Sequence, residues 1–273
     1  MSVLERGPSL KPNYLRRRQI TTGIIEKLWP YEVVEHEHND AIAKIQQLGK
    51  QEYKFIFAHG HIFMADPFIV GAFAVNVSQE ILKGNLLSPI AWHQRKFASL
   101  ARWNGTTAYP IVTRHTVDRK KNFQNGKELP LNSGYRKYAV ESGRALGESQ
   151  KTTTVFVAPH GGRTSTPQGP AGPAVETIAR FAQNSKAEQA QKEKIAVVLV
   201  GVSIRGVTKY EKGKTDRFNL RKKIVLEIDM LTLDELKNQA ILNSISLDEE
   251  ITNRINNLSY KTYLKPKQLS KEQ

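Results

Sequence analysis

The sequence predicts an α/β fold in which a mainly parallel, mixed sheet is flanked by helices within a single domain. Runs of β-branched and aromatic residues, such as 152–158 and 195–204, alternate with longer segments of helical spacing. That alternation is typical of parallel sheets whose strands are joined by helices. Apolar residues make up 39% of the 273 positions, enough for a packed core and too many for a wholly disordered chain.

The N-terminal part is expected to begin irregularly and then to alternate helix and strand. Residues 1–35 are expected to be irregular because three prolines interrupt them. An apolar run over 53–58 predicts a buried strand, preceded by a short helix over 40–49. The next helix is expected over 67–83, where Asp66 is a suitable N-cap and a proline occupies the first turn.

The remaining elements continue this alternation toward the C-terminus. Strands are expected over 106–113, 152–158, 195–204 and 223–230. Helices are expected over 94–103, 132–148, 174–194, 234–241 and 247–258. Residues 118–130 are expected to form a polar, lysine-rich loop. We therefore divide the chain into an irregular or helical extension (1–50), a catalytic domain (51–260) and a loose polar tail (261–273).

The composition excludes several classes of site. The sequence has no cysteine, which rules out disulfides, thiolate metal sites, iron–sulfur clusters and cysteine nucleophiles. Its first residues lack the basic segment and apolar run of a signal peptide. The most apolar stretch, 55–77, carries two histidines and Asp66, which would be costly to bury in lipid. We therefore expect a cytoplasmic protein that is soluble or associates peripherally with a membrane.

The positive charge is concentrated in two segments. Lysine and arginine number 41 against 26 acidic residues, a net charge of +15 with histidine neutral. The segment 95–127 has a net charge of +7 and the segment 205–223 one of +6. Such concentration suits an anionic partner: nucleic acid, an acidic protein, anionic lipid or a phosphorylated substrate. Solvated loops that keep a protein soluble explain the same charge and are the commoner case.

A histidine and an aspartate follow the strand expected over 53–58. His61 stands five residues before Asp66, where the next helix is expected to begin. In open α/β sheets, sites gather beyond the carboxyl ends of the strands. A carboxylate beside an imidazole fixes its tautomer and stabilises the imidazolium, which makes the histidine a competent general base. A structural histidine beside a capping aspartate fits the same spacing.

A second loop, after the strand expected over 152–158, carries residues suited to an anion. Its adjacent glycines let backbone N–H groups approach an anion, and the guanidinium of Arg163 matches a phosphate in shape. Arg114 and His115 follow the strand expected over 106–113 in the same way. Each of these blocks alone also fits a solvated turn. The joint occurrence of the His61–Asp66 block, the Arg114–His115 block and the second loop is much less expected by chance than any one of them. The residues of the second loop are His160, Gly161, Gly162 and Arg163.

This order of blocks resembles the glycerolipid acyltransferase superfamily, whose members carry an H-x-x-x-x-D block and a later Pro–Gly–Arg block. The sequence is most similar there to the soluble, plastid-type glycerol-3-phosphate acyltransferases, over about residues 53–205. The resemblance implies their α/β fold, no cofactor, no metal, a place in phospholipid synthesis, and a cytoplasmic or plastid-like stromal location. The residues that carry it are His61, Ala65-Asp66-Pro67, Arg114-His115 and Ala158-Pro159 with Gly161-Gly162-Arg163.

The resemblance also implies direct transfer of an acyl group from an acyl thioester to a hydroxyl of glycerol 3-phosphate. His61, oriented by Asp66, would take the proton from the hydroxyl, whose oxygen would then attack the thioester carbonyl. Arg114, His115 and Arg163 correspond to the family's ligands for the substrate phosphate. The donor would be acyl-CoA or acyl-carrier protein. Both are anionic, as is a membrane surface, so the basic segments would suit any of the three.

Two positions depart from the family pattern. His160 stands where the family commonly has Glu or Ser, and Ser165 stands where the plastid-type enzymes carry a second basic residue. A 1-acylglycerol-3-phosphate (lysophosphatidate) acyltransferase is therefore the alternative within the family. With its glycine neighbours, His160 is still expected to contact the substrate.

The alternative from another class is a basic nucleic-acid-binding protein. The charge supports it, but the sequence contains no zinc finger, basic zipper or aromatic–basic RNA motif. We therefore expect nucleic acid not to be the partner. Two His-x-His pairs do not predict a metal site either, because no acidic ligands stand at fixed spacing.

Overall fold

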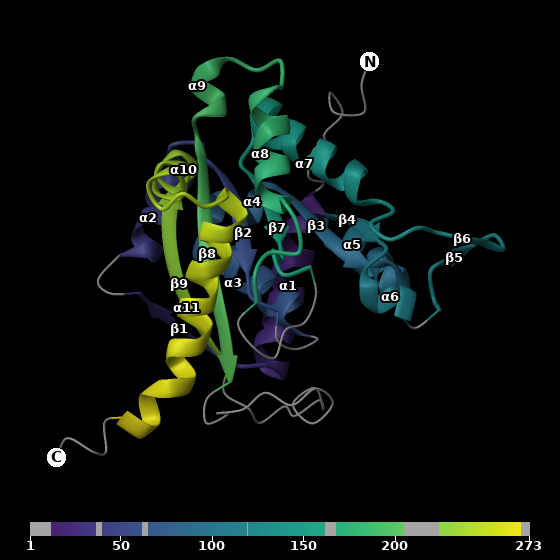
Figure 1. The fold of residues 1–273 in the computed structure, drawn as a ribbon, viewed down its shortest axis with the longest axis horizontal. Helices are drawn as coiled ribbons and strands as arrows, with labels where there is room; N and C mark the ends of the chain where they lie inside the picture. Colours follow the sequence, from purple (N-terminus) through teal and green to yellow (C-terminus); the bar gives the residue numbers. More distant parts are fainter. Residues whose placement is uncertain are drawn as a thin grey trace.

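A seven-stranded sheet with helices on both faces forms the centre of the molecule (Figure 1), which confirms the predicted α/β class. The computed structural model describes residues 12–36, 40–61, 65–118, 120–161, 168–204 and 224–268. The strand order is β1-β9-β8-β2-β7-β3-β4. The strands are β1 (Tyr31–Glu35), β2 (Lys54–His59), β3 (Asn85–Ala91), β4 (Thr106–Ile111), β7 (Thr153–Val157), β8 (Ile195–Ile204) and β9 (Ile224–Thr232).

Five neighbouring strands of the sheet run parallel, and the two strands at one end run the other way. β2 pairs in parallel with β7 and β8, and β3 pairs in parallel with β7 and β4. β9 is antiparallel to β8 and parallel to β1. The sheet is therefore mixed but mainly parallel, as predicted. The carboxyl ends of β2, β3, β4, β7 and β8 lie at one edge.

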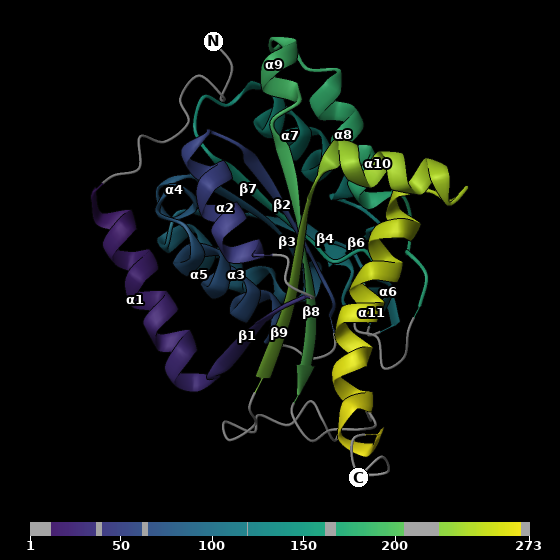
Figure 2. The same ribbon diagram turned by 90° about the vertical axis from the view of Figure 1, so that its left-hand side faces the viewer.

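The helices cover the two faces in separate groups (Figure 2). One face packs against α1 (Pro12–Leu28), α2 (Ala41–Lys50), α3 (Asp66–Val77) and α4 (Gln79–Lys83). The other packs against α7 (Tyr135–Glu148), α8 (Ala174–Gln183), α10 (Leu233–Leu242) and α11 (Leu247–Gln268). The shorter elements are the 3₁₀ helix η1 (Trp92–Phe97), α5 (Ala98–Trp103), α6 (Arg114–Asp118), α9 (Gln189–Lys192) and the hairpin of β5 (Phe123–Gln124) and β6 (Lys127–Glu128).

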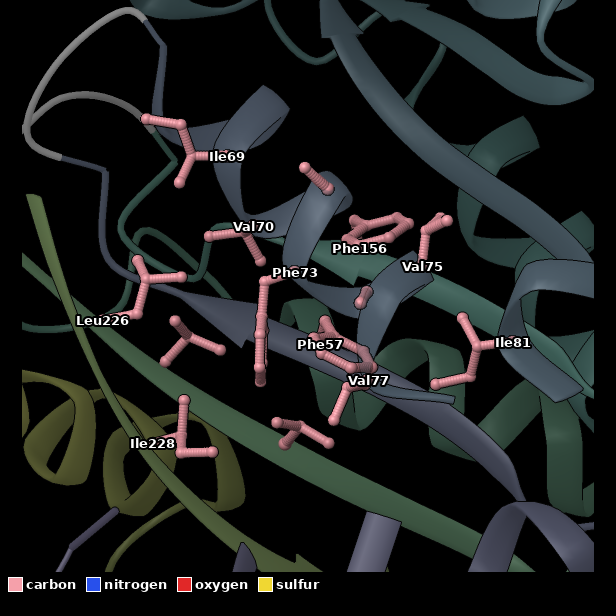
Figure 3. Packing of buried hydrophobic residues seen from close by; sticks show 14 of the residues in the cluster. Phe57, Ile69, Val70, Phe73, Val75, Val77, Ile81, Phe156, Leu226 and Ile228 are labelled. Atoms are coloured by element: carbon pink, nitrogen blue, oxygen red, sulfur yellow. The ribbon is translucent and has the colours of Figure 1, made fainter. Parts of the chain in front are cut away.

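Side chains of the central strands alternate between two apolar clusters. Phe57 of β2 lies beneath α3, with its ring centre 6.2 Å from that of Phe73 and 5.7 Å from that of Phe156 (Figure 3). The next residue, Ala58, belongs to the cluster on the opposite face, together with Leu146. Every residue of β2 and β8 is buried. These strands therefore form a rigid support for the loops that follow them.

The N-terminal segment differs from its expected structure. The expectation of irregular structure over 1–35 is wrong for residues 12–35, which form α1 and β1; residues 1–11 lie outside the described part. Pro12 occupies the first position of α1, where a missing N–H group costs little. Because β1 pairs with β9, this segment belongs to the same sheet as the rest of the chain.

Several helix boundaries also differ. The helix expected over 67–83 is divided at Ser78, whose backbone is extended (φ −146°, ψ 134°). Asp66 is the first residue of α3, and Ala65 takes the N-cap position. The helix expected over 174–194 forms as two separate helices, α8 and α9. At the C-terminus, α11 continues through residues 261–268, where a loose tail was expected.

Besides β1, a second strand of the sheet, β3, has no counterpart in the sequence-based expectation. β3 contains Pro89 together with Asn85 and Ser88, a composition that is atypical of a strand inside a sheet. It nevertheless lies between β7 and β4. The loop expected over 118–130 likewise contains the short exposed hairpin of β5 and β6. The strand expected over 106–113 forms as the edge strand β4, where its proline is tolerated.

Candidate active site

The loops with the predicted site residues leave the same edge of the sheet. His61 stands two residues after β2, His160 three residues after β7, and Arg114 three residues after β4. β7 is the direct neighbour of β2, so His61 and His160 come from adjacent strands. β4 lies three strands from β2, a lateral separation of about 14 Å at ordinary strand spacing. The topology thus places His61 and His160 after two central strands, and Arg114 after the outermost strand β4.

His61 and Asp66 lie together at the start of α3. His61 Nδ1 is 3.5 Å from Asp66 Oδ2, and the Asp66 side chain is fully buried while that of His61 is 21% exposed. The distance is that of an ion pair, although Nδ1 makes no hydrogen bond to the described residues. Asp66 stands in the first turn of α3, where the helix dipole interacts favourably with a carboxylate. Because Nδ1 is the ring nitrogen beside the carboxylate, Nε2 is the nitrogen left to take a proton from a substrate. A carboxylate beside the imidazole is what a histidine general base requires.

His59 is buried directly beneath this pair. Its ring centre lies 6.4 Å from that of His61 with the planes nearly perpendicular, and its Nδ1 is 2.9 Å from the carbonyl oxygen of Gly60. Burial lowers the pKa of His59 to about 4, and positive charge on His61 or His160 opposes its protonation as well. His59 is therefore neutral at neutral pH and donates Nδ1–H to the Gly60 carbonyl.

The buried neutral state of His59 predicts acid sensitivity of the fold. A histidine in the unfolded chain has a pKa near 6.5, so below that pH the unfolded state binds a proton that the folded state takes up only near pH 4. We expect His59 to remove about 3 kcal/mol from the free energy of unfolding between pH 7 and pH 4. Urea unfolding across this range measures it. His59→Asn, which retains a donor for Gly60, should have a flatter pH profile; parallel profiles for the two proteins would contradict the assignment.

Helix α11 closes one side of the site through two glycines. The register of β2 and β8 places Gly60 beside Gly201. A Cβ atom on Gly201 would come within 2.5 Å of Leu258 Cβ, and one on Gly60 within 3.1 Å of Ser259 Oγ. Glycine at both positions therefore lets the backbone of α11 approach the strand ends closely. Sequence reasoning found no role for this helix in the site.

His160 is held between the second loop and α11. Its side chain is 8% exposed, and its Nε2 lies 3.0 Å from Asn256 Oδ1. Burial lowers the pKa of His160, and positive charge on His61 lowers it further. The next residue, Gly161, has a φ of +67° and donates its N–H to the carbonyl of Ala158. This turn requires the left-handed conformation that glycine adopts without strain.

For the remaining predicted site residues, the structure gives either the backbone alone or no position. Arg114 and His115 begin α6, and their side chains lie outside the described set. Gly162 and Arg163, with Ser165, also fall in a range that the structure does not describe. The structure thus brings together His61, Asp66 and His160, and puts the backbone of Arg114 and His115 at the same edge.

One histidine at this edge escaped the sequence analysis. His93 follows β3, and its Nδ1 lies 3.1 Å from Thr116 Oγ1 of α6, which in turn is 3.0 Å from Thr113 Oγ1. His93 therefore ties η1 to the helix that carries Arg114 and His115. The available signal was its position after a strand, but that strand was itself not predicted.

The basic segment 205–223 leaves and re-enters the fold at the same edge. Its own residues lie outside the described ranges, but Ile204 and Ile224, which flank it, pair with each other at the end of β8. The other basic segment includes η1, α5 and α6, which follow β3 and β4. Both concentrations of charge therefore connect to the edge that holds His61.

The described residues contain neither a membrane-spanning helix nor a cluster of metal ligands. Within those ranges, no helix combines the length and apolarity needed to cross a bilayer. The same ranges hold no group of three or more histidine, aspartate or glutamate side chains arranged as metal ligands.

No protein-family model matches this sequence, and no curated protein matches it. The chemistry of the residues themselves is the guide to function.

Proposed function

We propose that the protein is a glycerol-3-phosphate O-acyltransferase. It would transfer a fatty acyl group from an acyl thioester, acyl-CoA or acyl-carrier protein, to a hydroxyl of glycerol 3-phosphate. The observation that carries the proposal is the pairing of His61 with the fully buried Asp66, 3.5 Å apart at the carboxyl end of β2. The order of the neighbouring blocks, which resembles that of glycerolipid acyltransferases, supports the same reaction.

In this mechanism His61 Nε2 removes the proton from the attacking hydroxyl as the oxygen bonds to the thioester carbonyl carbon. The imidazolium that forms is stabilised by the Asp66 carboxylate, and it returns the proton to the departing thiolate. The negative charge that develops on the carbonyl oxygen faces the dipole of α3. The N–H groups of Phe68 and Ile69 already donate to the carbonyl of Ala65, so these two amides are not the oxyanion donors.

The substrates are proposed to bind around this pair by charge. Arg114, His115 and Arg163 would hold the phosphate of the acceptor, because a dianion requires fixed cations and planar guanidinium groups match its oxygens. The basic segments would attract the donor, or an anionic membrane surface that presents it. Ser165 in place of a second basic residue favours lysophosphatidate as the runner-up acceptor, since a weaker phosphate site suits a substrate that is also held by its acyl chain.

The decisive test is whether thiol release from an acyl thioester depends on the acceptor. Acyl-CoA and acyl-carrier protein are each incubated with enzyme and with glycerol 3-phosphate, lysophosphatidate or no acceptor, and the products are identified with their regiochemistry. Thiol release is expected only with glycerol 3-phosphate. Release that ignores the acceptor would contradict the proposal, and turnover with lysophosphatidate alone would select the runner-up. Tight binding of nucleic acid with a steep salt dependence would favour a different class of protein.

A further inference from the structure

The position of the proton on His160 follows from its neighbours. Asn256 donates Nδ2–H to the carbonyl oxygen of Gln168 at 3.0 Å, which directs its Oδ1 to His160 Nε2, also at 3.0 Å. An amide oxygen only accepts hydrogen bonds, so Nε2 must carry a proton. Because burial disfavours the charged ring, His160 is neutral at neutral pH and its Nδ1 keeps a lone pair.

The described residues provide no donor for that lone pair. His160 Nδ1 is buried and makes no hydrogen bond within the described part of the chain. A buried acceptor that stays unpaired costs free energy, so native proteins seldom retain one without a use. The loop that carries His160 follows β7, the neighbour of β2, and the ring is near enough to His61 that charge on His61 disfavours protonation of His160. A hydroxyl group of a ligand would complete this site.

We propose that the acyl-accepting substrate donates a hydrogen bond to His160 Nδ1 from its hydroxyl that is not acylated. Asn256 is the positioning residue, because it keeps Nδ1 unprotonated. The inference rests on the proposed acyltransferase function and narrows its acceptor class. A phosphorylated polyol with a second free hydroxyl beside the attacked one satisfies His160. A lysophosphatidate does not, because its other hydroxyl is already esterified.

Two deoxy analogues of glycerol 3-phosphate test the wild-type protein. 3-Hydroxypropyl phosphate lacks the central hydroxyl, and 2-hydroxypropyl phosphate lacks the terminal one. The position of the acyl group in the product formed from glycerol 3-phosphate shows which hydroxyl is attacked, and the analogue that retains this hydroxyl is the one to compare. We expect kcat/KM for glycerol 3-phosphate to exceed that for this analogue by about 100-fold or more, because the analogue leaves a buried acceptor unpaired. We call this ratio the hydroxyl preference.

Two variants remove the lone pair by different means. His160→Phe keeps a flat ring and deletes the acceptor. Asn256→Asp keeps the shape of the amide, but its carboxylate stabilises a protonated His160, whose Nδ1 then donates instead of accepting. Each is expected to lower the hydroxyl preference below about 5-fold, chiefly by lowering kcat/KM for glycerol 3-phosphate. Asn253→Asp is the matched control, since Asn253 is exposed one turn earlier on α11. It should keep the wild-type preference.

The outcomes separate this inference from the function on which it rests. If the wild type acylates glycerol 3-phosphate but shows a preference below about 5-fold, the inference is wrong and the function stands. The same holds if either variant folds, as judged by its circular dichroism and melting temperature, and retains the wild-type preference. If no phosphorylated acceptor supports transfer by the wild type, the proposed function itself fails. Loss of preference in a folded variant, with the control unchanged, supports the inference.

Discussion

Replacement of His61 by alanine is expected to lower kcat for acyl transfer to glycerol 3-phosphate by about 10²–10⁴-fold, the usual contribution of a general base. The His61 side chain is partly exposed and its Nδ1 faces the carboxylate of Asp66, so its removal deletes the base without opening a cavity in the core. KM for the donor should change little because the base acts on the attacking hydroxyl. Steady-state thiol release at saturating acceptor measures the effect.

A substitution of Asp66 tests the contribution of its charge to the action of His61. Asp66→Asn keeps the volume of a fully buried side chain but withdraws the charge that stabilises the imidazolium, so kcat should also fall by about 10²-fold or more. His36→Ala is the matched control, because His36 directly follows β1 and its Nδ1 lies 3.0 Å from the carboxylate of Glu227 on β9, away from β2. Wild-type turnover in the His61 variant, or an equal loss in His36→Ala, would contradict the assignment of the base.

The elements that sequence reasoning predicted correctly are those whose local pattern agrees with their place in the fold. β8 is apolar except for Ser203 because both of its faces are buried. α10 has acidic residues in its first turn and a capping box at Thr232. The misplaced elements depend on tertiary contacts. β3 forms despite Pro89 because β7 and β4 pair with its two sides. In α1 a run of three arginines obscures the apolar periodicity, although Arg18 is buried.

The same distinction applies to the site. His61 and Asp66 lie five residues apart, so a local motif sufficed to bring them together. His160 and Asn256 are separated by 96 residues, and nothing in the spacing of either indicates the other. Their contact exists because Gly60 and Gly201 allow α11 to approach the strand ends. A local motif can thus indicate the His61–Asp66 pair. The contact of His160 with Asn256 depends on how α11 packs, which the sequence does not indicate.

The fold also depends on a buried arginine in α1. Arg18 is 2% exposed, and its guanidinium donates to four carbonyl groups at distances from 2.6 to 3.0 Å. Two of these carbonyls end α4 and two follow α5, so the cation lies where two helix dipoles present their negative ends. Burial lowers the pKa of Arg18 to about 10, which leaves it charged at neutral pH. In the described part of the chain no carboxylate pairs with it. The four carbonyl groups belong to Leu82, Gly84, Asn104 and Gly105.

Replacement of Arg18 by methionine is expected to lower the free energy of unfolding by about 3–5 kcal/mol. Methionine has a similar length, so the main loss is the set of charge-assisted hydrogen bonds to the four carbonyls, two of them buried and two partly buried. Arg18→Lys should lose less, because an ammonium group retains the charge and can satisfy up to three of the carbonyls. Urea-induced unfolding of the two variants and the wild type, with the slope of the transition compared, measures both changes.

Arg16→Met provides the matched control for this prediction, since Arg16 stands two residues away on the same helix and is exposed. Surface substitutions of this kind change stability by about 0.5 kcal/mol or less. Equal losses from the two methionine substitutions would mean that helix propensity or net charge accounts for the effect and that the carbonyl cluster does not. A large loss at Arg18 alone would show that its hydrogen bonds are a main part of the contact of α1 with α4 and α5, although the sequence predicts no regular structure over α1. Because α5 directly follows the 3₁₀ helix that carries His93, the same variant should also weaken the support of α6 at the edge that holds His61.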